Sequence, residues 1–318
     1  MSRFFKFLIC LLACTQLAHA DEGIDCPATA LSLDKIYQHV EQIDQQRRAM
    51  YKNHISGTML VDNRPAQFNA LYKQCLVGKE YQLQKLTSEQ LQRLFRAIYK
   101  VVFYAANVEA AEQLLPVLAE KIRRGEKVEA NIDRLHRVYV KTRQFDRAND
   151  LERKYPEIEF SEIPAIVDTA TAGRSMFQVQ PGTDKGQQQL VRKPFAFAKG
   201  GQVIVISTPI CNPCKRMLTW LQTQPELMQV MAEHSVWMAS VSGNLYWQDI
   251  VQTNIDYAPI EMRYAYAKSD WPEIKYWATP TFYFYMDGKL VKQVSGWGRK
   301  ENGEKLKAGL KLIGLLPS

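Results

Sequence analysis

Residues 202 to 217, QVIVISTPICNPCKRM, indicate the architecture of the second half of this chain. An apolar run typical of a buried strand leads into two cysteines, Cys211 and Cys214, and a helical pattern follows them. A lone CxxC is compatible with a redox centre, with half of a metal site or with a small structural disulfide. The residues around it have to distinguish between these three.

The order strand, CxxC, helix favours redox chemistry. It places Cys211 at a helix N-terminus, where unpaired backbone N–H groups and the helix dipole stabilise a thiolate. Cys214 lies one turn inside the helix, where it is shielded and can resolve a mixed disulfide formed by Cys211. Pro213 falls in the first turn, where its missing N–H costs little.

The other kinds of site fit the sequence less well. A zinc site needs about four ligands, usually a second CxxC or a Cys/His pair at short spacing. Lys215 occupies the position of the histidine that covalent haem attachment through CxxCH requires. An inert structural disulfide is disfavoured because the small ring that a CxxC pair closes is strained and labile. We therefore expect no metal and no cofactor beyond the dithiol. The histidines after residue 20 are scattered, at His39, His54, His136 and His234.

Residues 1–20 are typical of a secretory signal peptide. Two basic residues precede a short apolar stretch, and small residues then favour cleavage after Ala20. The apolar stretch is far shorter than the roughly 20 residues of a membrane span. A lipidated Cys14 is the weaker alternative, because Leu12 is a poor residue for a lipoprotein signal. We expect export, most simply to a bacterial periplasm.

Removal of the signal leaves four cysteines, which an oxidising compartment favours as pairs. Three connectivities are open, and the CxxC spacing favours Cys211–Cys214. That choice leaves Cys26–Cys75 as a structural disulfide closing a long loop, worth roughly 4 kcal/mol in the chain-entropy model. Two buried free thiols are the alternative for that second pair.

The formal net charge of +8 is distributed over mixed-charge segments such as residues 120–137. This pattern indicates solvated helix faces, with only a weak bias towards acidic or membrane-surface partners. We expect no nucleic-acid partner.

Helical periodicity runs from about residue 31 to residue 155. Thr87, three residues before Gln90, predicts a capping box at the start of one helix. From this capped helix to about residue 155, the sequence predicts two helix pairs with a faint internal repeat. The repeat weakly resembles the tetratricopeptide family. Such repeats imply a protein-binding surface, although a plain helical bundle explains the same pattern. The packing positions are Phe95, Ile98, Val102, Val108 and Ala111 in the first pair and Ile132, Leu135, Tyr139, Phe145 and Ala148 in the second.

A second motif, ATPTFYFYMDGKLVKQVSGW at residues 278–297, predicts a strand, a turn and a second strand. Together with the CxxC it resembles the thioredoxin superfamily over residues 174–318. The resemblance implies that Pro280 is cis and faces the CxxC, and that Thr279 offers backbone hydrogen bonds to a substrate chain. We therefore predict a helical domain at 21–160, a linker at 161–173 and a thioredoxin-like α/β domain with a central mixed sheet.

Within the superfamily the domain is most similar to the periplasmic TlpA/ResA-like branch. It departs from the usual pattern at Ile210, where a Trp commonly precedes the first cysteine, and at Val205, where cytoplasmic thioredoxins carry a buried acid. The insertion before the second motif is rich in aromatic residues, which form either a rim beside the CxxC or part of the core. They are Trp247, Tyr257, Tyr264, Tyr266, Trp271, Tyr276 and Trp277.

These features predict an exported thiol-disulfide oxidoreductase that acts on protein thiols and disulfides. Cys211 forms the mixed disulfide, Cys214 resolves it, and Thr279 and Pro280 hold the substrate. Pro213 favours a reductase, which needs a membrane electron donor. An oxidase or isomerase is the first alternative. The second is a non-enzymatic envelope or secretion assembly protein that binds partners through its helical half.

Overall fold

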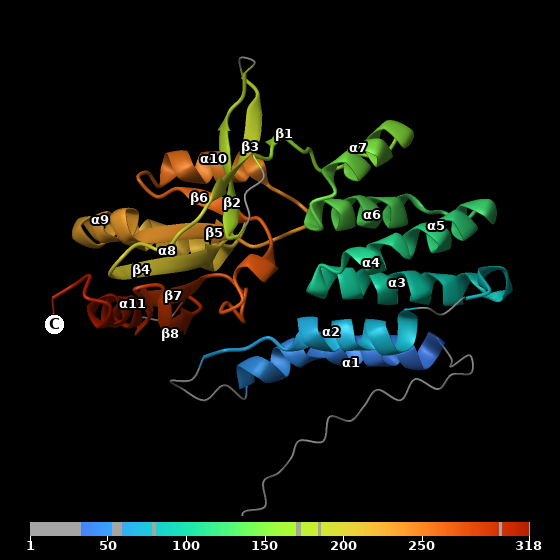
Figure 1. Ribbon diagram of the computed structural model, residues 1–318, viewed down its shortest axis with the longest axis horizontal. Helices are drawn as coiled ribbons and strands as arrows, with labels where there is room; N and C mark the ends of the chain where they lie inside the picture. The colour runs from blue at the N-terminus through green and yellow to red at the C-terminus, as the bar shows by residue number, and fades with distance from the viewer. Residues whose placement is uncertain are drawn as a thin grey trace, which may run out of the picture.

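The computed structural model describes residues 33–52, 59–77, 81–169, 173–183, 186–298 and 301–317. The predicted signal peptide and Cys26 lie outside these ranges. In Figure 1 the helices of the first half occupy one side of the molecule, and a sheet with its covering helices occupies the other. We call residues 33–154 the helical half and residues 165–317 the sheet half.

The helical half is built on amphipathic helices, of which α3 shows the local rules best. Its capping box forms as predicted: the Thr87 hydroxyl accepts the N–H of Gln90 at 3.2 Å, and the Gln90 side chain accepts the N–H of Thr87 at 2.9 Å. Its apolar face is buried against α1, α2 and α5. The elements are α1 (Leu33–Lys52), α2 (Arg64–Leu71), η1 (Tyr72–Leu76), η2 (Leu83–Lys85), α3 (Ser88–Ala105), α4 (Val108–Glu112), α5 (Leu114–Arg123), α6 (Glu129–Lys141) and α7 (Phe145–Lys154).

The two predicted helix pairs differ in how well they follow the expected pattern. All five predicted packing residues of α6 and α7 are buried. In the first pair Val108 is 49% exposed, so its predicted packing role is wrong. Val108 is the first residue of α4, directly after the N-cap Asn107, and it points away from the core. The second helix of this first pair is also divided, at Gln113, into α4 and α5.

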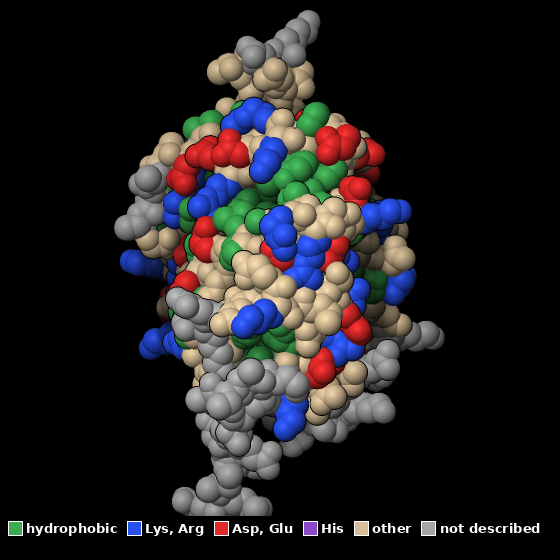
Figure 2. Space-filling model, turned by 90° about the vertical axis from the view of Figure 1, so that its right-hand side faces the viewer, with side chains coloured by type: hydrophobic (Ala, Val, Ile, Leu, Met, Phe, Trp, Pro, Cys, Tyr) green, Lys and Arg blue, Asp and Glu red, His purple; other side chains and the backbone are tan. Residues whose placement is uncertain are grey.

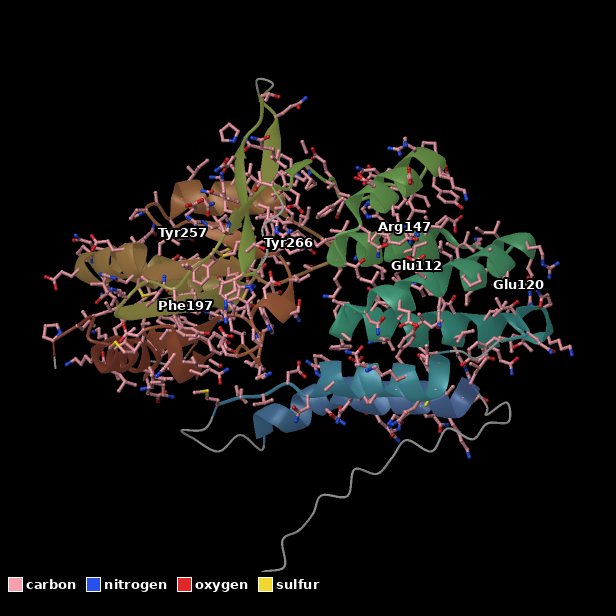
Figure 3. The ribbon with its side chains drawn as sticks, viewed as in Figure 1. Glu112, Glu120, Arg147, Phe197, Tyr257 and Tyr266 are labelled. Carbon is pink, nitrogen blue, oxygen red and sulfur yellow. The ribbon has the colours of Figure 1, made fainter. Side chains whose placement is uncertain are left out.

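Charged residues of both signs alternate over the surface of the helical half. Figure 2 shows this end of the molecule, with Lys and Arg side chains interspersed with Asp and Glu around a patch of hydrophobic side chains. Ion pairs connect neighbouring helices, and Figure 3 labels one of them, between Arg147 of α7 and Glu112 of α4.

The sheet half contains an eight-stranded mixed sheet in the order β1-β3-β2-β6-β5-β4-β7-β8. The strands β4, β5 and β6 are parallel neighbours, whereas β7 runs antiparallel to β4 and β8 antiparallel to β7. The elements are β1 (Ala165–Val167), β2 (Ser175–Pro181), β3 (Gln188–Pro194), β4 (Gly201–Ser207), α8 (Asn212–Gln222), α9 (Pro225–His234), β5 (Ser235–Ala239), α10 (Trp247–Asp256), β6 (Met262–Ala265), η3 (Lys268–Asp270), β7 (Thr281–Met286), β8 (Lys289–Ser295) and α11 (Glu301–Leu312).

The segment predicted as a linker, residues 161–173, contributes a strand. Within it, β1 pairs in parallel with β3 at the edge of the sheet. Isolated apolar residues in a Pro- and Gly-containing segment carry no strand periodicity, which explains why the pairing is invisible in the sequence. Part of the segment between the two halves therefore belongs to the sheet.

Alternating residues of β4 and β7 separate the two faces of the sheet, as the period of two requires. Val203, Val205 and Phe284 face a core that α8, α9 and α11 cover. The opposite face, with Ile204 and Tyr283, is covered by the segment after β3 and by the insertion before β7. There Phe195 contacts Trp271 and Phe197 contacts Tyr285, with ring centroids 4.8 and 4.6 Å apart.

The helical half is joined to the sheet by hydrogen bonds from the end of α6. Arg143 donates from Nε to the Tyr266 carbonyl at 2.9 Å and from Nη2 to the Ala265 carbonyl at 2.8 Å. Lys141 donates from Nζ to the Val241 carbonyl at 2.9 Å. Because these acceptors lie at the end of β6 and after β5, the helical half is fixed against the carboxyl ends of the parallel strands.

Two further contacts close this junction. Phe145 packs edge-on against Phe177 of β2, with ring centroids 5.9 Å apart, and Asp62 donates its N–H to the Lys275 carbonyl at 2.8 Å. The apolar core continues from α1–α7 into one face of the sheet. Among the residues that the structure describes, no helix is long and apolar enough to cross a membrane.

Candidate redox site

The CxxC lies where the sequence predicts it, between a buried strand and a helix. The strand β4 ends at Ser207, and Cys211 is the N-cap of α8, with extended backbone angles of φ −89° and ψ 114°. The sulfur of Cys211 accepts the N–H of Cys214 at 3.4 Å. Both cysteines are free thiols in this structure. The helix N-terminus therefore supplies a backbone donor to the first sulfur.

The two thiols differ in exposure and in acidity. Cys211 is half-buried, whereas Cys214 is fully buried. Hydrogen bonds from the Cys214 thiol, from the Thr279 side chain and from the Cys214 amide, together with the charge of Arg216, lower the pKa of Cys211 to about 6, against the opposing effect of its burial. The neighbouring Cys211 and burial raise the pKa of Cys214. The pair therefore has one nucleophilic thiolate and one protected thiol.

Thr279 and Pro280 lie directly beside the first cysteine. The Thr279–Pro280 peptide bond is cis, and the Cys211 sulfur lies 3.7 Å from the Thr279 carbonyl oxygen. Pro280 is buried and its carbonyl accepts the N–H of Gly296 at 2.8 Å. The antiparallel pairing of Ile206 with Thr281 places the start of β7 next to the end of β4. The fold thus brings together the four residues Cys211, Cys214, Thr279 and Pro280, which we call the redox site.

Of the other predicted cysteine pair, only Cys75 lies within the described residues. Cys75 is buried in η1 and is disulfide-bonded. Cys26 lies outside the described residues, so the Cys26–Cys75 pairing stays a prediction. No group of three or more potential metal ligands occurs among the residues that the structure describes.

Val205 and Ser207 define the surroundings of Cys214. Val205 is buried in the core beneath α8 and has no titratable group. Ser207, two residues further along β4, is also fully buried, and its hydroxyl has no oxygen or nitrogen partner among the described residues. The Ser207 side chain nevertheless opposes the rise in the pKa of the Cys214 thiol. The serine at the end of the apolar run is visible in the sequence, but nothing in the local pattern indicates that it lies beside Cys214.

A cavity of about 400 Å³ opens beside the redox site, between the two halves of the chain. Thr279 and Ile210 line it next to Cys211. Phe103 and Lys141 contribute the wall from the helical half, and Trp277 contributes to the wall from the insertion. Ile210, at the position of the expected Trp, is 49% exposed. A hollow of about 590 Å³ beside α9 contains none of the redox-site residues.

Some aromatic residues of the insertion are buried in the core and some line the cavity beside the CxxC, so both of the roles that the sequence left open occur. Tyr264, Trp271 and Tyr276 are buried, and Tyr264, Tyr276 and Trp277 line the cavity. Trp247, Tyr257 and Tyr266 are half-buried and do not line it. Figure 3 labels two of these, with Tyr266 nearer to the helical half than Tyr257.

No protein-family model matches the chain, and no curated protein matches it. Among solved structures, it is similar to an uncharacterized thioredoxin-like protein from Porphyromonas gingivalis, with 16% identity and a TM-score of 0.29, over 43% of this chain and 88% of that one. A thioredoxin-like protein from Bacteroides caccae matches at 11% identity and a TM-score of 0.29, over 90% of this chain and 96% of that one. The C-terminal domain of an uncharacterized protein from Bacteroides fragilis matches at 15% identity and a TM-score of 0.28, over 46% and 98%. Likenesses this remote assign no function.

Proposed function

We propose that this chain is a thiol-disulfide oxidoreductase that acts on protein cysteines through Cys211 and Cys214. The observation that carries the proposal is the asymmetry of the two thiols. One is half-buried and has a pKa lowered to about 6, and the other is fully buried with its pKa raised. A purely structural disulfide has no need of an ionised, accessible sulfur at a helix N-terminus.

The geometry supports a two-step exchange. The Cys211 thiolate attacks one sulfur of a substrate disulfide, the substrate S–S bond breaks, and the departing sulfur takes up a proton. Cys214 then loses its proton and attacks the Cys211 sulfur, which releases the second substrate sulfur as a thiolate and leaves a Cys211–Cys214 disulfide. Two electrons have moved from the dithiol to the substrate.

The second step becomes easier once the first has occurred. The largest cause of the raised pKa of Cys214 is its neighbour Cys211. In the mixed disulfide the Cys211 sulfur carries no negative charge, so the hydrogen bond that favours the neutral Cys214 thiol weakens, the charge repulsion disappears, and the pKa of Cys214 falls. The buried Ser207 hydroxyl then stabilises the thiolate that attacks.

The proposal includes a substrate position along Thr279. Its backbone lies beside the Cys211 sulfur and precedes the cis proline. A substrate chain that pairs with this backbone would present its own sulfur to Cys211. We also propose that the sheet half belongs to the TlpA/ResA-like branch. The β2–β3 hairpin before the CxxC strand and the long insertion before the cis proline support this assignment.

We propose the bacterial periplasm as the compartment and reduction as the direction. The signal-like residues 1–20 and the disulfide-bonded Cys75 support an oxidising compartment. Pro213 before the second cysteine supports a reductase, which requires electrons from a membrane donor. The helical half, with its weakly repeat-like helix pairs, offers a surface for a protein partner.

The reduction potential of the mature protein tests the direction. Equilibration in graded dithiothreitol or glutathione buffers, with the oxidised fraction read by mass after thiol alkylation, should give a value near −270 mV or lower for a reductase. A value of about −120 to −180 mV would assign an oxidase or isomerase instead. Replacing both cysteines, as Cys211→Ser and Cys214→Ser, abolishes the cellular phenotype of an enzyme, whereas an assembly protein retains it.

A further inference from the structure

The cavity beside the redox site contains more positive than negative charge. Four charged side chains line it: Asp62, Arg64, Lys141 and Lys268. Asp62 is fully engaged by Arg64, with Oδ1 accepting from Nε at 2.8 Å and Oδ2 from Nη2 at 2.7 Å. This pair is internally neutral. The charge of the cavity is therefore set by the two lysines.

Neither lysine has a carboxylate within 4 Å among the residues that the structure describes. Lys141 is buried, and its ammonium group contacts the Val241 carbonyl at 2.9 Å and lies 5.2 Å from the centre of the Phe103 ring. Lys268 lies 5.6 Å from the centre of the Trp277 ring. Ring faces and a single carbonyl compensate an ammonium group only in part.

We propose that this cavity binds a carboxylate that neighbours the reacting cysteine of the substrate, so that the redox site selects acidic substrates. The inference deepens the proposed function and rests on it. Thr279 and Ile210 belong both to the cavity wall and to the immediate surroundings of Cys211, so a chain seated along Thr279 continues into the cavity. A volume of about 400 Å³ accommodates one or two side chains or a tripeptide thiol.

Burial makes both lysines more acidic than an exposed lysine. Burial lowers the pKa of Lys268 to about 8, with Arg64 lowering it further and Asp62 opposing. Burial, with the charges of Lys268 and Arg143, lowers the pKa of Lys141. A bound carboxylate would raise both pKa values, because it favours the charged form of each ammonium group.

The test compares disulfide probes of different charge with the reduced, full-length mature protein. Oxidised glutathione carries carboxylates, bis(2-hydroxyethyl) disulfide is neutral and cystamine is cationic. We expect the second-order rate of protein oxidation at pH 7 to be about tenfold higher for the anionic probe than for the neutral one, and lowest for cystamine, after each rate is corrected for the thiol pKa of its leaving group. A pair of peptide disulfides with Asp and Glu, or Asn and Gln, beside the cysteine separates protein substrates from small thiols.

Matched variants test whether the preference for the anionic probe arises from the cavity. Lys268→Met should reduce the anionic preference about three- to tenfold, whereas Lys268→Arg should retain it. Lys275→Met is the control, since Lys275 is an exposed lysine of the same insertion that does not line the cavity.

Equal rates for all three probes, or a preference that survives Lys268→Met, would overturn the inference while leaving the proposed function intact. Failure to exchange with any probe would overturn the proposed function itself. A preference seen only with the peptide pair, or only with glutathione, supports the inference and identifies the source of the carboxylate.

Discussion

The ionisation of Cys211 should be visible as the pH dependence of its alkylation. With a pKa of about 6, the thiolate fraction is about 9% at pH 5 and about 90% at pH 7. The rate of reaction with iodoacetamide should therefore rise about tenfold over this interval and then level off. An ordinary thiol, with a pKa of about 8.5, would gain about a hundredfold over the same interval and continue to rise above pH 8.

The alkylation rate reports on Cys211 because the other described cysteines do not react with iodoacetamide. Cys214 is fully buried and its pKa is raised, and Cys75 is disulfide-bonded. Whole-protein mass spectrometry after an acid quench should thus show a single adduct, which peptide mapping assigns to Cys211. The absolute rate is a poor guide, since a lower pKa also weakens the nucleophile; the midpoint of the profile is the informative quantity.

Cys214→Ala tests the cause of the shift. The hydrogen bond from Cys214 is the largest contribution that lowers the pKa of Cys211. A hydrogen bond to a charged group is worth about 1.5–3 kcal/mol, and 1.36 kcal/mol corresponds to one pKa unit, so the midpoint should rise by about 1 to 2 units. Arg216→Met is the control, with a smaller rise, because Arg216 is exposed and screened. A wild-type midpoint near 8.5, or an unchanged midpoint in Cys214→Ala, would refute the electrostatics described above.

Three further predictions follow from other contacts. Because the reduced protein holds one proton fewer above the pKa of Cys211, its reduction potential should fall by about 59 mV per pH unit below pH 6 and about 30 mV above it; one slope of 59 mV from pH 5 to pH 8 contradicts this. Arg143→Met removes the side-chain hydrogen bonds to two backbone carbonyls of the sheet half, so it should lower the free energy of unfolding by about 2–4 kcal/mol in urea titrations. A loss below about 0.5 kcal/mol, which is typical of a surface substitution, would contradict a role of Arg143 in joining the two halves. Gly309→Ala places a Cβ 2.3 Å from the Phe284 ring and should lower the same free energy by about 1–3 kcal/mol; an unchanged unfolding midpoint would show that α11 can move away.

Features that depend on neighbouring residues were predictable from the sequence. The capping box at Thr87 and Gln90 forms as expected, and Cys211 is the N-cap of a helix. Thr279 precedes the strand of a hairpin, as the second motif indicates. In each case the residues that determine the geometry lie within a few positions of one another, so the local rules of caps, turns and alternation suffice.

Features that depend on docking were not predictable. Lys141 and Val241 are 100 residues apart, and no periodicity links the end of one helix to a loop after a distant strand. The exposed Val108 shows the same limit, since its apolar side chain is compatible with the predicted face, and its exposure follows from its place as the first residue of α4. The cavity and its two lysines therefore emerge only from the folded chain.

The chemistry and the selectivity of this site are separable because different elements determine them. The pKa of Cys211 is set by Cys214, Thr279 and Arg216, all of which belong to the sheet half. The charge of the cavity comes in part from the helical half, through Lys141 at the end of α6. Substitution of Lys141 should accordingly change which disulfides react while leaving the alkylation midpoint near pH 6. The helical half then forms one wall of the cavity beside the redox site, and Arg143 is one of the residues that hold it against the sheet half.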